Sequence, residues 1–211
     1  MRPFREFVRE HLPEPPARVL EVGCGQGELA TALAVEGYDV LGIDPAAPYG
    51  DLFRRITLDD VEEDERFDGV VASHVLHHIR DLDAAVAKIA RLLRPGGVLV
   101  VDDFGWDLLD EATLDWFYGQ RRALAAAGHG EAPASAEELR REWEVHHLGV
   151  HPYRTLLDAF AARFDERERT PVPHLYRKLA GVATEVLEEA LVESGAIRPL
   201  GFRFAGVVRS R

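Results

Sequence analysis

The chain has 211 residues, 46% of them apolar, and a net charge of −12. This length and composition predict one α/β domain with a substantial core, and no apolar run approaches the roughly 20 residues of a membrane span. Because no apolar run is long enough, we expect no membrane as a partner. An acidic chain repels nucleic-acid phosphates, so we expect no nucleic acid as a partner either. The single cysteine, Cys24, excludes an internal disulfide and favours a cytoplasmic protein.

The first half of the chain predicts β-strands that alternate with α-helices. Runs of strand-forming residues occupy 18–23, 38–43, 55–58, 67–73 and 98–102. Apolar residues at helical spacing predict helices over 3–12, 26–36 and 82–93. This alternation indicates right-handed crossovers and a parallel sheet.

The second half of the chain loses this alternation. Residues 106–164 predict consecutive helices, one of which begins with a capping box formed by Ser135 and Glu138. A last helix is predicted over 174–194 and a final strand over 200–209. The fold class is therefore α/β with a helical insertion.

Three glycines at alternate positions follow the first strand. Gly23, Gly25 and Gly27 stand between an apolar run and a predicted helix. Glycine lets a ligand approach the backbone, and the amides at the start of a helix point outward. The pattern predicts a nucleotide-type site, although a tight turn without a ligand is the alternative. The dinucleotide fingerprint would need another glycine where Glu28 stands, which disfavours a nicotinamide enzyme.

Further motifs stand in order around this loop. They are Glu21 before it, Asp44 at the end of the second strand, Phe67–Val71 leading to Leu76-His77-His78, and Leu92–Gly97 before another strand. Over residues 15–105 the chain resembles class I S-adenosylmethionine (SAM) dependent methyltransferases, of the small-molecule type 11/12 kind. The remainder of the chain resembles them only in outline.

This resemblance implies a Rossmann-like three-layer sandwich. Its seven-stranded sheet would be mostly parallel, with an antiparallel last strand and a helical lid insert after strand five. The whole chain, 1–211, would be a single methyltransferase domain. It would comprise a SAM-binding half (1–105), a helical substrate-lid insert (106–165) and C-terminal strands and helix (166–211).

The resemblance also implies SAM as the cofactor and S-adenosylhomocysteine as its product. Glu21 would reach the aminoacyl end, Asp44 would accept from the ribose, and either Asp59 or Asp60 would accept from the adenine amino group. The full set of cofactor-binding candidates is Glu21, Gly23, Cys24, Gly25, Gly27, Asp44, Pro45, Asp59, Asp60, Ser73 and His74.

The expected reaction moves a methyl group to O or N of a small-molecule acceptor by in-line displacement. Orientation supplies much of the rate in such a reaction, and a base is needed only if the acceptor keeps its proton. His77 and His147 are the candidate catalytic bases, whereas His78 is expected to be packed against backbone. Aromatic residues after strand five are the acceptor-contact candidates: Trp106, Trp116, Tyr118 and Trp143.

Two alternatives stay open. His74, His77 and His78 have the spacing of a metal-binding motif of some small-RNA methyltransferases, but histidines replace its glutamates, so we expect no metal. A non-catalytic SAM-binding protein would keep every cofactor motif. The chain is expected to be a monomer or a homodimer.

Overall fold

The computed structural model describes residues 2–209, which form two compact units. The sheet unit comprises residues 2–103, 154–170 and 203–209, and the helical unit comprises 104–153 and 171–202. Within residues 2–209, every helix is too short or too polar to cross a membrane.

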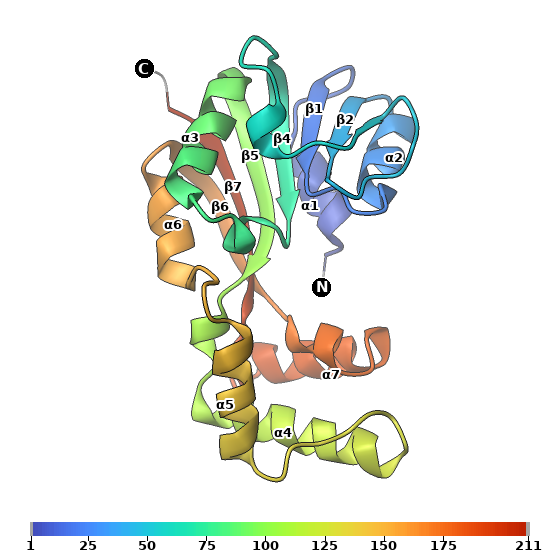
Figure 1. The fold of residues 1–211 in the computed structure, drawn as a ribbon, viewed down its shortest axis with the longest axis vertical. Coiled ribbons are helices and arrows are strands. Elements are labelled where there is room, and N and C mark those ends of the chain that lie inside the picture. Colours follow the sequence, from blue (N-terminus) through green and yellow to red (C-terminus); the bar gives the residue numbers. More distant parts are fainter. Residues whose placement is uncertain (1, 210–211) are drawn as a thin grey trace. The chain divides into compact units, whose positions relative to one another are not determined.

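A seven-stranded sheet, in the order β3-β2-β1-β4-β5-β7-β6, dominates the fold (Figure 1). Its strands are β1 (Arg18–Val22), β2 (Asp39–Ile43), β3 (Phe53–Arg54), β4 (Phe67–Ser73), β5 (Leu93–Phe104), β6 (Phe164–Val172) and β7 (Gly201–Val208). Pairing is parallel from β3 through β2, β1 and β4 to β5. The last strand, β7, runs antiparallel to β5. The predicted fold class is confirmed.

Helices cover both faces of this sheet. The helices of the sheet unit are α1 (Phe4–His11), α2 (Glu28–Val35), α3 (Leu82–Leu92) and α6 (Tyr153–Ala161), whereas α4 (Glu111–Ala126), α5 (Ala136–His146) and α7 (Val182–Glu193) belong to the helical unit. On one face α1 and α2 pack against Val19, Val71 and Ala205 in a single apolar cluster. On the other face Phe160 of α6 contacts Phe204 of β7, with ring centroids 5.0 Å apart. These contacts give the three layers of an α/β sandwich.

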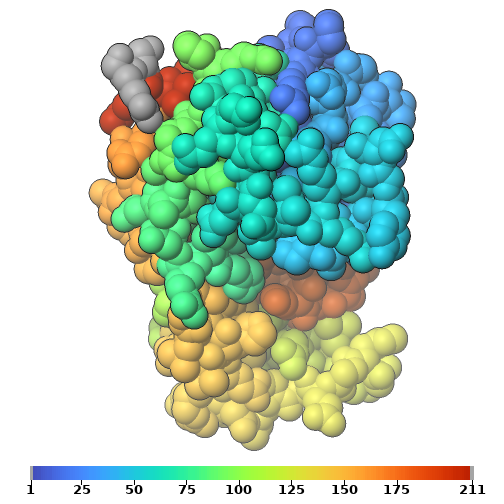
Figure 2. Space-filling model, turned by 45° about the horizontal axis from the view of Figure 1, so that its top comes forward, coloured from blue at the N-terminus to red at the C-terminus, as the bar shows by residue number. Residues whose placement is uncertain are grey.

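The apolar strands match their predicted ranges best. Strand β4 occupies 67–73, as predicted, because almost all of its residues are buried. The predicted strand 55–58 is wrong: β3 is the two-residue strand Phe53–Arg54. Strand β5 extends beyond the predicted 98–102 at both ends, and its pairing with β4 shifts register between Leu93 and Val98, where Gly96 has φ +79°. The segment between β3 and α3, coloured cyan to teal, occupies much of the face of the sheet unit that Figure 2 shows.

Strand β6 was not predicted from the residue pattern, although it is nine residues long. Its middle is charged and exposed, and only its ends, Phe164 and Val172, are buried. The amide of Arg209, after β7, donates to the carbonyl of Arg163, before β6, at 2.9 Å. Opposite ends of the two strands therefore meet, and they run antiparallel.

The helical unit has its own apolar core, in which α4 and α5 pack together. Ser135 caps α5 as predicted, since its hydroxyl accepts from the Glu138 amide at 3.2 Å. The Glu138 carboxylate reaches the Ala134 amide instead of Ser135, so the predicted capping box is only half correct. The predicted helix over 174–194 is interrupted at Gly181, where φ is +60°, and α7 begins after it.

Candidate cofactor site and acceptor residues

The three glycines after β1 all adopt left-handed backbone conformations. Their φ angles are +73° at Gly23, +53° at Gly25 and +78° at Gly27. A β-carbon at Gly27 would lie 2.4 Å from the Phe53 ring, whereas one at Gly25 would meet nothing within 4 Å. Glycine is therefore required by conformation at each position, and Gly25 leaves open space in which a ligand can approach the backbone.

Asp44 follows β2 and reaches back to this loop. Its carboxylate accepts from the Gly25 amide at 3.3 Å and from the Ala46 amide at 2.7 Å. The Asp44 side chain is half-buried and the neighbouring Pro45 is exposed. The carboxyl ends of β1 and β2 thus bring the glycine loop and this acid together, where ligands of parallel sheets bind.

Glu21 is buried inside β1, with 4% of its surface exposed. Burial raises the pKa of its carboxyl to about 7, although a hydrogen bond from the Ala30 amide lowers it. Its second oxygen, Oε2, is buried and has no hydrogen-bond partner among the described residues. A buried carboxyl oxygen without a partner is costly, so a donor on a bound ligand would stabilise it.

Glu21 is one of the residues that line a cavity of about 610 Å³. Its lining includes four cofactor candidates, Glu21, Gly23, Cys24 and Ser73, together with Phe4 and Arg5 of α1. Within the described residues, the other cofactor candidates are not part of this lining. Burial, helped by Glu21 and Asp44, raises the pKa of the Cys24 thiol to about 11, so the thiol stays protonated at neutral pH.

Asp59 and Asp60, the two candidates for binding the adenine amino group, differ in the hydrogen bonds that they already make. The Asp60 carboxylate accepts from the Thr57 hydroxyl at 2.7 Å and the Thr57 amide at 2.9 Å, and these bonds hold its pKa below the usual value. Asp59 is held through its backbone, since its carbonyl accepts from Lys88 Nζ at 2.6 Å. Among the described residues no hydrogen bond reaches the Asp59 carboxylate, which favours Asp59 as the acceptor for a ligand.

Histidines follow β4 as expected, with one difference. His74 has φ +51°, a strained value for a non-glycine residue, and its amide donates to the Asp102 carbonyl at 2.8 Å. His77 is buried, and its Nδ1 lies 2.5 Å from Oδ1 of Asp103. His78 is exposed. The expected packing of His78 is therefore wrong: the short turn after β4 directs His77 inward instead.

His74, His77 and His78 do not form the metal site that was the alternative interpretation of their spacing. Within residues 2–209, no group of three or more His, Cys, Asp or Glu side chains could hold a metal ion. His74, His77 and His78 lie in one short segment, but they do not meet as ligands.

The remaining candidates lie in the helical unit, where a chain of hydrogen bonds joins three of them. Trp143 Nε1 donates to the Trp106 carbonyl at 2.9 Å, and Trp106 Nε1 donates to the Val150 carbonyl at 3.1 Å. His147 Nδ1 donates to the Trp143 carbonyl at 2.6 Å. Trp143 and His147 are buried, so both hold the unit's core together.

Trp116 and Tyr118, on α4, are only partly buried. The Tyr118 hydroxyl donates to the Ala134 carbonyl at 3.0 Å. Trp116 Nε1 is buried without a hydrogen-bond partner among the described residues. These two residues, with the partly buried Trp106, are better placed for ligand contact than Trp143.

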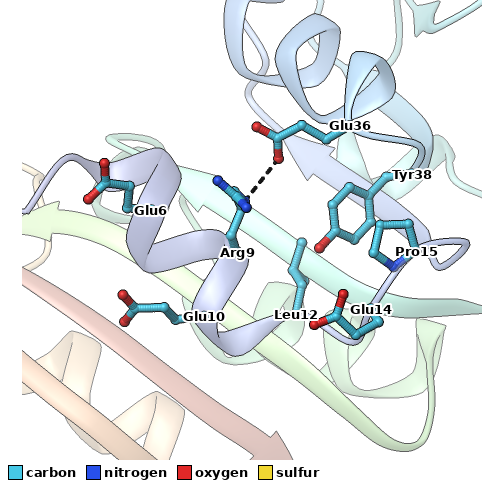
Figure 3. Close-up of a pocket in the computed structure, with 8 residues that line it drawn as sticks. All are labelled: Glu6, Arg9, Glu10, Leu12, Glu14, Pro15, Glu36 and Tyr38. Carbon is cyan, nitrogen blue, oxygen red and sulfur yellow. Dashed lines mark ion pairs between the residues drawn. The ribbon is translucent and has the colours of Figure 1, made fainter.

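A separate cavity, of about 640 Å³, has an acidic lining (Figure 3). Tyr38 and Pro15 lie side by side in it, and Arg9 pairs with Glu36 at 3.3 Å. Its lining comprises Glu6, Arg9, Glu10, Leu12, Glu14, Pro15, Glu36 and Tyr38. Leu12 to Pro15 precede β1, so this cavity lies at the amino ends of the strands, away from the candidate cofactor site at their carboxyl ends.

Comparison with known proteins identifies the family. Residues 1–150 match the model of a methyltransferase domain family. Over 97 residues the chain is 33% identical to the ubiquinone biosynthesis O-methyltransferase of Rhodopseudomonas palustris strain TIE-1. This match covers 40% of this chain and 38% of that protein. The chain thus spans about two fifths of the length of the curated relatives it matches.

Solved structures share the fold. An S-adenosylmethionine dependent methyltransferase from Mesorhizobium loti has a TM-score of 0.59 at 19% identity, and the match covers 96% of both chains. The N-methyltransferase NodS from Bradyrhizobium japonicum WM9, in complex with S-adenosylhomocysteine, has a TM-score of 0.57 at 15% identity and covers 98% of this chain and 86% of that chain. Because the family model matches most of its length and the fold agrees, the chain belongs to the methyltransferase domain family and is a class I SAM-dependent member.

Proposed function

We propose that the protein transfers a methyl group from SAM to an oxygen or nitrogen atom of a small molecule. The observation that carries this proposal is Glu21, which lines a cavity together with Gly23 and Cys24 of the glycine loop and has a buried Oε2 without a hydrogen-bond partner among the described residues. An ammonium group is the donor that such a carboxyl oxygen suits best, and SAM carries one on its aminoacyl end. The curated relative is an O-methyltransferase and one structural neighbour is an N-methyltransferase, which supports both acceptor atoms.

Each residue has a proposed task in holding the cofactor. Glu21 would bind the ammonium group, Asp44 the ribose hydroxyls, and Asp59 the adenine amino group. SAM supplies an electrophilic methyl group when bound. The protein's part is to orient that group toward the acceptor and to exclude water, which can supply on the order of 7 to 11 kcal/mol of the barrier in good cases.

The test of the cofactor site is calorimetric titration with S-adenosylhomocysteine. We expect binding to the wild type and at least a tenfold loss of affinity in Asp44→Ala. Asp64→Ala is the matched control, because Asp64 is exposed in the loop before β4. A wild-type protein that binds no S-adenosylhomocysteine would contradict the proposed function.

Turnover with a panel of phenols, amines and carboxylates separates an enzyme from a non-catalytic SAM-binding protein. The enzyme methylates a member of the panel, whereas the binding protein takes up S-adenosylhomocysteine and stays inert. Trp106, Trp116 and Tyr118 are the proposed acceptor contacts. Their substitution by alanine should raise KM for the acceptor and leave the affinity for S-adenosylhomocysteine unchanged.

A further inference from the structure

The acidic cavity of Figure 3 has no task in the proposed methyl transfer. Its walls come from α1, from the segment that leads into β1, and from the turn between α2 and β2, all within the sheet unit. The lining carries four glutamates and one arginine around a volume of about 640 Å³. A ligand bound here would be separate from the cofactor, so its binding does not depend on the proposed function.

Tyr38 is the one polar residue of this lining that is buried. It is 8% exposed, and its ring belongs to the apolar cluster that contains Phe7 and Leu33. Its hydroxyl makes no hydrogen bond to any of the described residues. In Figure 3 this hydroxyl points away from Pro15 and into the middle of the lining residues. A tyrosine hydroxyl can donate and accept, so its capacity is available to a ligand in the cavity.

The charges around this hydroxyl favour a cation. Burial, together with Glu14 and Glu36, raises the pKa of Tyr38, whereas Arg9 lowers it. The hydroxyl therefore keeps its proton at neutral pH, and its oxygen can accept a hydrogen bond from a positively charged donor. Because two carboxylates act against one guanidinium here, a positive charge beside the hydroxyl would be stabilised.

Only part of the negative charge of the lining is compensated. Glu36 pairs with Arg9 at 3.3 Å, and Glu10 also has an arginine partner. In the described part of the chain, neither Glu6 nor Glu14 has an arginine or lysine partner. These two carboxylates lie on either side of Glu10 in the sequence, so the uncompensated charge is spread along the cavity wall.

The spacing of the glutamates favours an extended organic cation over a metal ion. Glu6 and Glu10 are one turn apart on α1, about 6 Å along its axis, and Glu14 follows four residues later. Over the residues that the structure describes, no three His, Cys, Asp or Glu side chains converge as a metal ion would require. Pro15 and the Tyr38 ring add apolar surface to the same lining. Ammonium groups joined by short methylene chains match this combination.

We propose that this cavity binds a linear aliphatic polyamine. The ammonium groups of the polyamine pair with the carboxylates of Glu6, Glu10 and Glu14, and one of them donates to the Tyr38 hydroxyl. The methylene chain lies against Pro15 and the Tyr38 ring. Because the carboxylates on α1 and after it are exposed, added salt should weaken this binding.

Calorimetric titration of the 211-residue chain with spermidine, at low ionic strength, tests the proposal. We expect one spermidine to bind per chain. Glu14→Gln should lower the affinity on the order of fivefold, the most that an exposed ion pair contributes. Glu62→Gln is the matched control, because it removes the same charge from an exposed glutamate in the loop before β4 and should leave the affinity unchanged.

Tyr38→Phe is the second variant, and it removes only the hydroxyl. Since that hydroxyl has no hydrogen-bond partner among the described residues, the variant should fold like the wild type. Its affinity for spermidine should fall on the order of fivefold, the effect of losing one hydrogen bond to a charged donor. An unchanged affinity would overturn the proposed site.

Two further outcomes would also overturn the proposal. Equal losses in Glu14→Gln and Glu62→Gln would attribute the binding to the net charge of the chain. Complete displacement of spermidine by magnesium chloride, at matched ionic strength, would indicate diffuse counterions.

A basic protein partner is a separate possibility that the same titration distinguishes. Acetyl-trilysine amide carries the same charge as spermidine on a peptide backbone. We expect it to bind more weakly, because its backbone amides do not match the apolar part of the lining. Tighter binding of the peptide would assign the cavity to a basic protein segment and contradict the polyamine proposal.

Discussion

The carboxyl of Glu21 in β1 accepts a hydrogen bond from the backbone amide of Ala30 in the first turn of α2. The residue that precedes that helix, Gly27, has no side chain to cap it. A strand residue therefore satisfies one of the free amides at the helix start. Glu21 also lines the candidate cofactor cavity, so the same carboxyl that meets the helix start is the one proposed to bind the ligand.

The raised pKa of Glu21 predicts a pH dependence of stability. The folded pKa is about 7 against an ordinary value of 4.5, so the protonated form is favoured in the folded protein. The contribution to stability is complete below about 4.5 and is lost as pH rises through about 7, amounting to about 3 kcal/mol. Urea unfolding of wild type and Glu21→Gln should diverge by this amount between pH 4.5 and 7.5. Parallel pH curves for the two proteins would contradict the assignment.

Ligand binding should show the opposite pH trend. If the ionised Glu21 carboxylate receives the ammonium group, affinity for S-adenosylhomocysteine should rise about tenfold from pH 6 to pH 8, because ionisation occurs near 7. Calorimetry at both pH values measures this change. Glu21→Gln should bind weakly with little pH dependence, and an unchanged slope in that variant would rule out Glu21 as the cause.

Gly27→Ala should destabilise the protein in two ways. The φ of +78° costs about 1–2 kcal/mol for any residue with a β-carbon. The contact with the Phe53 ring, at 2.4 Å, adds about 1–3 kcal/mol of overpacking. Gly128→Ala is a matched control, because its φ is +82° and a β-carbon there would meet nothing within 4 Å. Equal losses in the two variants, by thermal unfolding, would show that the Phe53 contact is unimportant.

Glu188 is predicted to be essential for the helical unit. Its buried carboxylate accepts from the amides of His174, Leu175 and Tyr176 at 2.6–3.0 Å. Glu188→Ala leaves three amides without their acceptor, which should cost about 3 kcal/mol or more. Glu193→Ala, at the exposed end of the same helix, should change the unfolding free energy by less than about 0.5 kcal/mol. Comparable midpoints in chemical denaturation for the two variants would argue against this anchor.

Local sequence patterns were sufficient to predict an element where its hydrophobic pattern matches its burial in the structure. Strand β4 is apolar on both faces, and the glycine loop has its own conformational signature, so both were predicted. The charged strand β6 lacked any such pattern. The partner of His77 could not be predicted because Asp103 becomes its neighbour only through the pairing of β4 with β5. Which of the two adjacent histidines faces inward depends on the conformation of a single turn. His78 was therefore expected to be packed, although it is exposed and His77 is buried.

The composition of β6 also has a consequence for association between molecules. This strand ends the sheet on one side, and β3, which ends it on the other, has only two residues. Asp165, Glu166 and Arg167 are exposed along the outer strand. A strand from another chain that aligned there would have to strip water from these charges. The charged residues that prevented the prediction of β6 therefore disfavour edge-to-edge aggregation at this side of the sheet. At the other edge, the two-residue strand β3 offers few backbone groups with which another strand could pair.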